Sequence, residues 1–246
     1  MNNVFIILVK PQLGQNIGSV ARVMKNLNFK NLRIVNPRDG WPNQDVISTA
    51  AGADDVITNT KVFDNVSEAC NDLNYLFASS ARKRDLNIKT LDLVNTVSSL
   101  NKIEFSRNDF KFGILFGCES SGLSNEDLIT ANQLIYIPSN SDFSSLNISH
   151  AVSLICWEFF KFFNDLILDQ NSNISLNTSP TIKDMDYFYK NLCEKLNNSG
   201  FFHSDFMKKS IMENIKVLFN RAELSSQEIK TLNGIIKSLY EYNKQA

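Results

Sequence analysis

The strongest constraint on the fold of this chain is an alternation of short apolar segments with amphipathic ones. The apolar segments are rich in β-branched residues and have the length of buried strands, whereas the segments between them have helical spacing. Strands that alternate with helices predict a parallel sheet with helices on both of its faces. The expected strands are Val4–Val9, Leu32–Asn36, Leu73–Ala78, Gly113–Phe116 and Leu134–Ile137, and the expected helices between them are Ile17–Asn28, Gln44–Ala51, Val66–Asp72 and Asn125–Asn132.

The last third of the sequence indicates a second unit. Apolar residues from Asn147 to Leu168 recur at helical spacing, which predicts one long helix. The polar, proline-containing stretch that follows is typical of a surface linker. We therefore expect a domain over residues 1–168, a linker over 169–180 and a helical unit over 181–246. Because about 65 residues bury little core, this unit should lean on the first domain or on a second copy of itself. Its expected helices are Ile182–Leu196, Asp205–Phe219 and Gln227–Tyr242.

Composition limits the partners that this chain can bind. Its 246 residues include 25 basic and 26 acidic ones, so the net charge is -1 and the overall positive charge of a histone or a coat protein is lacking. Any nucleic-acid site must then be a local patch. A charge run is more often a solvated face, which is the favoured interpretation on charge alone. The candidates for such a patch are Arg82-Lys83-Arg84, Lys25, Lys30, Arg33 and Arg38.

The cysteines indicate the compartment. The four cysteines are far apart, form no C-x-x-C pair and are distant from both histidines, so no metal site is expected. Scattered, buried thiols suit a reducing compartment, and we expect a cytoplasmic protein. The apolar run Val4–Val9 is too short for a signal peptide, and Ile155–Leu168 is interrupted by charged residues, so we expect no membrane span.

Three glycine- or serine-rich segments follow expected strands, where open α/β sheets place their ligands. The first, Gly14–Arg22, runs from a loop into a helix whose free amides suit an anion. The second, Phe116–Leu123, sets the lone carboxylate of Glu119 between two glycines. The third, Ile137–Ser149, is a polar loop that enters the long helix. Taken singly, each segment is explained as well by a turn, a surface carboxylate or a helix cap. No G-x-G-x-x-G or P-loop pattern occurs, which removes most support for dinucleotide binding and P-loop hydrolysis.

Taken together and in this order, the three segments resemble the motifs of the SpoU (TrmH) branch of the SPOUT RNA methyltransferases. The matching residues are Asn16…Arg22, Phe116-Gly-x-Glu-x-x-Gly-Leu123 and Ser144-Ser-Leu-Asn-x-Ser149. Short segments elsewhere resemble one tRNA-methylating subgroup of that family, so the resemblance covers nearly the whole chain. These segments are Val35-Asn36-Pro37, Ala50–Ala53, Ser79–Arg82 and Leu218–Ala222.

The resemblance implies an α/β fold with a SPOUT-type parallel sheet, a deep trefoil knot and a small C-terminal helical extension. Such a knot is an exception to the rule that chains do not thread their own loops. It also implies that S-adenosylmethionine binds in a bent shape within the knot, held mostly by backbone groups. The residues implied to touch this cofactor are Ser79, Ser80, Ala81, Gly117, Ile137, Ser144, Ser145 and Leu146.

The implied reaction transfers the sulfonium methyl group to a ribose 2′-hydroxyl and needs no metal. By resemblance, the enzyme is a homodimer and its substrate is tRNA, methylated at nucleotide 32, the first of the anticodon loop. The implied catalytic residues are Arg22, Asn16, Glu119 and Asn147. Because an arginine in a protein keeps its proton, we expect Arg22 to grip the phosphate beside the target ribose.

Two positions depart from the family's pattern. Cys118 stands where relatives often carry arginine, and Phe143 where some carry tyrosine, so RNA contacts at these two positions are not carried over. Two alternatives stay open: a ribosomal RNA 2′-O-methyltransferase of the same family, and a catalytically silent RNA-binding protein.

Overall fold

The computed structural model describes residues 2–81, 88–100, 107, 109–168 and 179–243. Within these residues, seven strands form one sheet in the order β3-β2-β1-β6-β4-β7-β5, and every neighbouring pair is parallel. The parallel sheet expected from the sequence is therefore confirmed. The strands are β1 (Val4–Val9), β2 (Asn31–Val35), β3 (Lys61–Phe63), β4 (Tyr75–Ser79), β5 (Thr90–Asp92), β6 (Phe112–Phe116) and β7 (Gln133–Tyr136).

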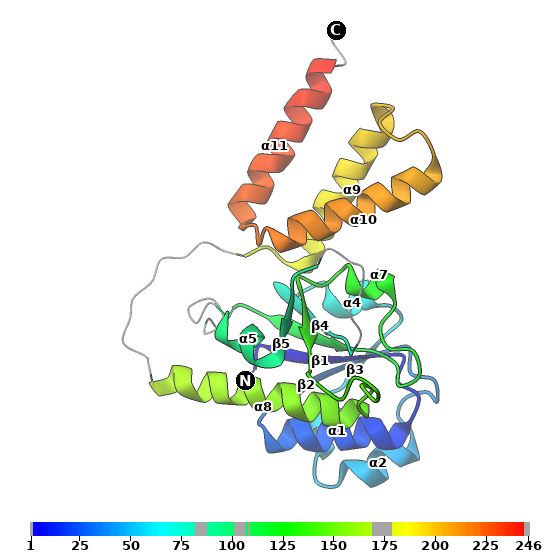
Figure 1. Cartoon of the computed structure of the whole chain (residues 1–246), viewed down its shortest axis with the longest axis vertical. Coiled ribbons are helices and arrows are strands. Elements are labelled where there is room, and N and C mark those ends of the chain that lie inside the picture. Colours follow the sequence, from blue (N-terminus) through cyan, green and yellow to red (C-terminus); the bar gives the residue numbers. More distant parts are fainter. Residues whose placement is uncertain (1, 82–87, 101–106, 108, 169–178, 244–246) are drawn as a thin grey trace.

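Helices cover both faces of the sheet (Figure 1). The apolar side chains of β1 point alternately to the two faces: Ile6 and Leu8 belong to one core cluster, and Ile7 and Val9 to the other. One face is covered by α1 (Gly14–Asn26), α2 (Gln44–Ala50), α3 (Asp54–Thr58), α5 (Leu93–Ser98) and α8 (Ile148–Leu168), and the opposite face by α4 (Val66–Cys70) and α7 (Asn125–Leu128).

The helix starts follow capping rules that are readable in the sequence. Ser124 and Asp127 form the expected capping box at the start of α7. Ser225 and Glu228 form the same reciprocal pair at the start of the last helix. Four short elements that we did not expect are present: α3, β3, β5 and α5. Each has three to six residues, which is too few for a periodicity to show.

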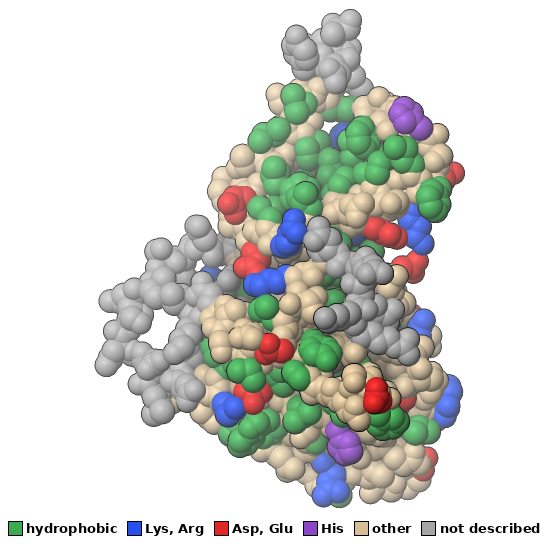
Figure 2. Space-filling model, viewed as in Figure 1, with side chains coloured by type: hydrophobic (Ala, Val, Ile, Leu, Met, Phe, Trp, Pro, Cys, Tyr) green, Lys and Arg blue, Asp and Glu red, His purple; other side chains and the backbone are tan. Residues whose placement is uncertain are grey.

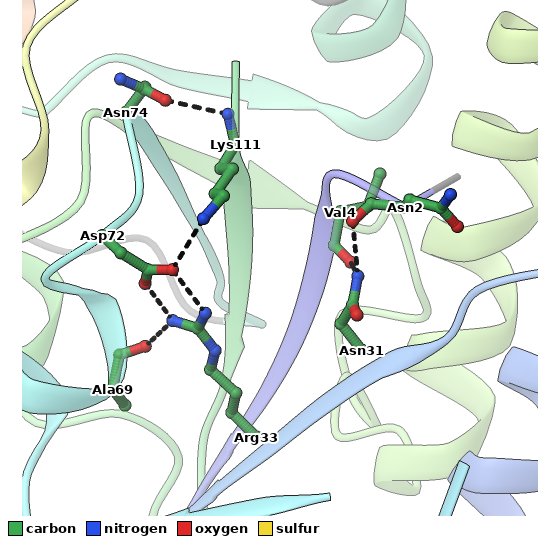
Figure 3. A network of polar contacts seen from close by, with 8 residues as sticks. All are labelled: Asn2, Val4, Asn31, Arg33, Ala69, Asp72, Asn74 and Lys111. Carbon is green, nitrogen blue, oxygen red and sulfur yellow. Dashed lines mark hydrogen bonds and ion pairs between the residues drawn. The ribbon is translucent and has the colours of Figure 1, made fainter. Parts of the chain in front are cut away.

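Arg33 does not belong to an exposed basic patch, so that expectation was wrong. Its side chain points from β2 into the protein, where both terminal nitrogens pair with Asp72 at 2.6 and 3.0 Å (Figure 3). The guanidinium also lies 3.9 Å from the centre of the Phe5 ring. Asp72 accepts a further hydrogen bond from Lys111 at 3.3 Å. Arg33 therefore joins β2 to the segment that leads into β4.

The other residues expected in the basic patch divide into three groups. Lys25 pairs with Asp55, and Arg38 with Asp39, so the charge of each is offset on the surface. Lys30 is exposed. The run Arg82-Lys83-Arg84 lies outside the described residues.

Three further helices, which we call the tail, follow residue 178 and pack above the sheet on the α4 side (Figure 1). They are α9 (Ile182–Asn198), α10 (Asp205–Arg221) and α11 (Ser226–Asn243). Their own core is small and centres on Phe188 and Tyr189. Ile182 and Val217 instead join the cluster that covers the sheet, so the tail leans on the first part of the chain. Most of the expected linker, residues 169–178, lies outside the described residues.

Hydrogen bonds fix the tail to the loops around β4 and α7. The Ile182 amide donates to the Leu73 carbonyl at 2.5 Å, directly beside the Arg33–Asp72 pair. The side chain of Asn220, which is buried, donates to the Ile129 carbonyl at 3.1 Å. No helix among the described ranges combines the length and the apolarity that a bilayer crossing needs.

Candidate functional site

The site lies where three neighbouring strands end. β6, β4 and β7 are adjacent in the sheet, and their carboxyl ends meet at one edge. The loops that follow them enclose a pocket of about 180 Å³. β4 contributes the segment 79–81, β6 the loop 117–123, and β7 the loop 137–146, while the first turn of α8 closes one side. Segments that are distant along the chain thus line a single pocket.

The loop after β6 folds back on itself, and two glycines permit this. The Gly122 amide donates to the Cys118 carbonyl at 2.8 Å, and Gly122 has a φ of +71°, which side chains disfavour. A Cβ on Gly117 would overlap the backbone of Gly122 and Leu123. The close approach of these two backbone segments therefore requires glycine at position 117.

The loop after β7 is shaped by its own polar groups. The Ser139 hydroxyl donates to the Ser144 carbonyl at 3.2 Å, and the Phe143 amide donates to the Asn140 carbonyl at 3.1 Å. Ser144, Ser145 and Leu146 line the pocket beyond this turn, whereas the Phe143 ring is 78% exposed. The wall on this side is therefore built from backbone, hydroxyl groups and two aliphatic side chains, Ile137 and Leu146.

A chain of hydrogen bonds connects the three sequence segments. Glu119 accepts hydrogen bonds from the backbone amides of Gln12 and Leu13, at 2.9 and 3.3 Å. It also accepts one from the side chain of Asn16 at 2.9 Å. Asn147 donates to the Asn16 side-chain oxygen at 3.0 Å. The start of α1, the β6 loop and the start of α8 are thereby locked together.

Ser149 extends this chain by one residue. Its amide and its hydroxyl both donate to the side-chain oxygen of Asn147, at 2.8 and 2.7 Å. The Asn147 amide group is therefore oriented, with its nitrogen toward Asn16 and its oxygen toward α8. We refer to Ser149, Asn147, Asn16 and Glu119 as the polar chain.

Close packing of α1 on α2 holds the start of the polar chain in place. A Cβ on Gly14 would come 2.5 Å from the side-chain oxygen of Asn43, and one on Gly18 would overlap Thr49. Asn43 itself caps α2 by accepting from the Val46 amide at 3.0 Å. The two glycines of the first segment thus allow α2 to pack closely on α1. The amides of Gln12 and Leu13, just before α1, donate to Glu119.

Arg22 stands apart from the polar chain. It lies on α1, two turns beyond the start of that helix, and its side chain is exposed. It does not line the pocket. Of the four residues expected to be catalytic, the structure therefore brings together Asn16, Glu119 and Asn147, and it leaves Arg22 facing solvent.

Cys118 lies in the pocket wall. Partial burial would raise the pKa of its thiol, but hydrogen bonds from Ser120 and Ser121 outweigh this, so the pKa is lowered from its ordinary value. Cys70 and Cys156 are fully enclosed, and burial raises the pKa of both thiols. No group of three metal-ligating side chains occurs in the part of the chain that the structure describes.

The sequence predicts most of the pocket wall. All eight residues expected to touch a cofactor line this pocket, together with Glu119. Sequence reasoning missed Gln12, whose amide holds Glu119 and whose side chain donates to Ser120 at 3.1 Å. The available signal was its position directly before the first glycine-containing segment. Phe116, Leu123, Ile148 and Ala151 add apolar surface that we did not expect.

Two protein families match this chain. Residues 3–157 match the SpoU rRNA Methylase family, and residues 183–246 match the family described as tRNA methyltransferase TrmJ, C-terminal domain. Among curated proteins, the tRNA (cytidine/uridine-2'-O-)-methyltransferase TrmJ of Salmonella typhimurium is 32% identical, over 99% of each chain. The TrmJ of Sodalis glossinidius is 31% identical, over 99% of this chain and 94% of the relative.

Solved structures give the same result. The crystal structure of TrmJ from Z. mobilis ZM4 superimposes with a TM-score of 0.81 and 32% identity, and covers 95% of this chain and 97% of its own. A probable methylase family protein from Haemophilus influenzae Rd KW20 has a TM-score of 0.61 and 30% identity, covering 99% and 98%.

Proposed function

Because this chain belongs to the SpoU methylase family, we propose that it is an S-adenosylmethionine-dependent methyltransferase acting on the ribose 2′-hydroxyl of a cytidine or uridine in tRNA. The observation that carries the proposal is that the second and third family segments line one pocket, while Asn16 of the first is hydrogen-bonded to both Glu119 and Asn147. Relatives named as tRNA methyltransferases match along the whole length of the chain, tail included.

The pocket suits S-adenosylmethionine in its chemistry. Ile137, Leu146 and Leu123 offer apolar surface for a flat base, while Ser80, Ser144 and the β6 loop offer hydroxyl and backbone groups for polar edges. The glycine at position 117 keeps the floor of the loop free of a side chain. When bound, this cofactor supplies a methyl group on a positively charged sulfur.

The residues of this chain have to align the acceptor ribose and leave its proton a path to an acceptor outside the protein. Glu119 already accepts three hydrogen bonds from protein groups, so its main task is to hold the start of α1 against the β6 loop. Asn147 and Asn16 present side-chain amides beside it and can orient the ribose hydroxyl. The proton leaves as the new bond forms, toward solvent or an RNA phosphate oxygen near this edge.

Arg22 is proposed to bind the phosphate beside the target ribose. Its exposed guanidinium keeps its charge and fits a phosphate with two parallel hydrogen bonds. An Arg22→Lys variant retains the charge but loses this fork, and we expect the rate of methylation to fall at least tenfold. Activity near that of the wild type would exclude a two-point phosphate clamp.

Three structural features belong to the same proposal. The first is a deep trefoil knot, supported by the way the chain leaves β7, lines the pocket and returns along α1 as α8. The second is the division into a methyltransferase domain (1–168), a linker (169–180) and a helical domain (181–246), supported by two families that match separate parts of the chain. The third is a homodimer, which Leu154 and Trp157 support, since both lie on α8 and are 44% and 49% exposed.

The target nucleotide is proposed to be number 32, the first of the anticodon loop, and the compartment to be the cytoplasm, where four free thiols are stable. A second candidate is ribosomal RNA, favoured by the description of the family that matches residues 3–157. The match of the tail to the TrmJ C-terminal domain favours tRNA.

Methylation of unmodified transcripts separates these outcomes. Purified protein is incubated with labelled S-adenosylmethionine and either tRNA or ribosomal RNA transcripts, and the methylated ribose is located by its resistance to alkaline cleavage. We expect incorporation into tRNA at nucleotide 32. Methylation of ribosomal RNA alone would identify a ribosomal RNA methyltransferase of the same family. Cofactor binding without any methylation would indicate a catalytically silent RNA-binding protein.

A further inference from the structure

A second hollow, of about 510 Å³, lies in the tail between α9 and α11. Each helix turns one polar face toward it. Tyr187, Asn191 and Lys195 follow one another at intervals of one turn along α9. Lys230, Lys237 and Tyr240 face them from α11. We call this hollow the tail groove.

The tail groove has a fixed shape. The Asn191 side chain donates to the side-chain oxygen of Asn233 at 2.9 Å and so joins the two helices across the groove. The apolar sides of the same helices meet around Phe188 and Ile229, both buried. Because Lys230 and Lys237 stand two turns apart on one helix, their Cα atoms are spaced by roughly 10 Å along its axis.

The charge in the tail groove is mainly positive. Three lysines line it against one glutamate, Glu241, which is 3.8 Å from Lys237. The Lys195 ammonium lies 4.6 Å from the centre of the Tyr240 ring. The Tyr187 side chain is 70% exposed at the edge of the groove. The groove therefore offers cationic points beside an accessible aromatic face.

We propose that the tail groove binds the sugar–phosphate backbone of the RNA substrate, at a place away from the reacting nucleotide. The inference rests on the proposed function, since it takes the same RNA as its ligand. Lysines bind phosphates as point charges, and an exposed aromatic ring stacks on an unpaired base. An acidic peptide would satisfy the lysines but would leave the Tyr187 face unused, so RNA is the better match.

The placement of the tail adds a consequence for substrate choice. Hydrogen bonds from Ile182 to Leu73 and from Asn220 to Ile129 hold the tail on the first part of the chain. The groove therefore keeps a constant position relative to the pocket. An RNA that reaches both sites gains affinity from the second one, whereas a short stem-loop that fills only the pocket does not.

The test is a titration of fluorescently labelled RNA, followed by anisotropy, with full-length unmodified tRNA and with the isolated anticodon stem-loop. The variant carries Lys230→Glu and Lys237→Glu together. The matched control is Lys190→Glu, an exposed lysine on α9 that does not line the groove. We expect tRNA binding by the double variant to weaken at least tenfold near 0.1 M salt. The slope of log affinity against log salt should fall by about one to two.

Further readouts separate binding from catalysis. We expect the turnover number at saturating tRNA, the affinity for S-adenosylmethionine and the binding of the isolated stem-loop to stay at wild-type values. Tyr187→Ala should weaken tRNA binding several-fold, while Tyr187→Phe retains it, because only the first loses the stacking face. Circular dichroism checks that each variant keeps its helices.

Several outcomes would overturn the proposal. Wild-type tRNA affinity in the double variant would do so, as would an equal loss with Lys190→Glu. If a polyglutamate peptide bound the tail groove and the variants did not change tRNA binding, the groove would be assigned to an acidic protein instead. Failure of the proposed function has a separate signature, because wild-type protein would then methylate no tRNA at all.

Discussion

Among single residues, Glu119 joins the β6 loop to the start of α1 through three hydrogen bonds. Its carboxylate receives two backbone amides and one side-chain amide, all from the segment that opens α1. A carboxylate is an acceptor only, so three donors can point at it without conflict. The same residue lines the pocket. Assembly of the site and the shape of the pocket therefore depend on one side chain.

We predict that Glu119→Gln disrupts this arrangement, although the two side chains are nearly identical in size. The glutamine nitrogen would face a donor, which costs about 1 kcal/mol for a half-buried mismatch. The expected result is a loss of methylation by at least tenfold and weaker cofactor binding, measured by calorimetry. Gln12→Ala is a suitable control, because it keeps the backbone amide and removes only the bond to Ser120. A Glu119→Gln enzyme with full activity would contradict the role given to this carboxylate.

A second prediction concerns the Arg33–Asp72 pair and pH. Partial burial alone would raise the pKa of Asp72, but the hydrogen bonds and charges of Arg33 and Lys111 outweigh it, so the pKa lies below its ordinary value of 3.8. A carboxyl group whose pKa is lowered by folding contributes stability above its unfolded pKa, and this contribution is lost as the pH falls through its folded pKa.

We therefore expect Asp72→Asn to lower the free energy of unfolding at pH 7 by about 1–3 kcal/mol, a value between those of surface and buried pairs. The variant should then unfold at a lower temperature than the wild type. The difference should shrink as the pH falls below about 4, because the wild type then loses the same charge. Thermal melts across this range measure it. Asp39→Asn, which alters a pair with Arg38 in which both side chains are about half exposed, is the control and should have little effect.

Arg33 also shows where sequence reasoning stops at this scale. A single arginine in a strand reads equally as a surface charge or as half of a buried pair. The deciding partner, Asp72, is 39 residues away in the sequence and is recognisable only once α4 lies on the sheet. The polar chain was predictable as a set of residues, because the family resemblance names Asn16, Glu119 and Asn147, but its order of contacts was not.

At the scale of elements, the loop after β6 depends on the absence of a side chain at position 117. We predict that Gly117→Ala leaves the sheet folded but displaces the loop, because the added carbon would overlap the backbone at positions 122 and 123. Cofactor affinity should fall at least tenfold in a calorimetric titration.

The matched control is Gly234→Ala, in the middle of α11, where an added carbon meets nothing within 4 Å. That change should stabilise the helix by about 0.5–1 kcal/mol, since alanine is the better helix former. Equal cofactor affinity in both variants would show that the loop tolerates a side chain at position 117.

The longer elements were predictable and the shorter ones were not. β1 was expected with its observed bounds, because it is an unbroken apolar run of strand length. α8 was expected within one residue, because its twenty-one residues display helical periodicity. β5 has only three residues and pairs with one strand, β7. A segment this short shows no pattern that distinguishes a strand from a loop. The order of strands was beyond reach, since the pairing of β1 with β6 depends on the packing of the whole chain.

At the scale of the whole molecule, two regions each expose large apolar side chains to solvent, in addition to scattered ones such as Ile47 and Phe143. One is the tail, where Figure 2 shows hydrophobic side chains gathered in the upper part of the view. The other is α8, where Trp157 stacks on Phe160 with ring centres 5.9 Å apart and is still about half exposed. An apolar stripe on a long helix is typical of a subunit contact.

We predict that Trp157→Glu converts a dimer into a monomer. A charge in the centre of an apolar contact lacks a partner, which costs several kcal/mol on association. Sedimentation velocity should show half the wild-type mass, and methylation should fall with it. Tyr187→Glu, which places a charge at a more exposed aromatic of the tail, should leave the mass unchanged. A wild-type protein that sediments as a monomer would contradict the proposed dimer.

The position of β1 inside the sheet, between β2 and β6, has a consequence for the protein while it is being made. β1 is synthesised before the other strands of the sheet, yet one of its two neighbours, β6, begins only at Phe112. At about 5–20 residues per second, that neighbour follows after roughly 5–20 s. During this interval an apolar strand exposes an open edge, a template for wrong pairing. We expect nascent chains to need shelter by a chaperone until Phe116 has been synthesised, and fragments that end before it to aggregate.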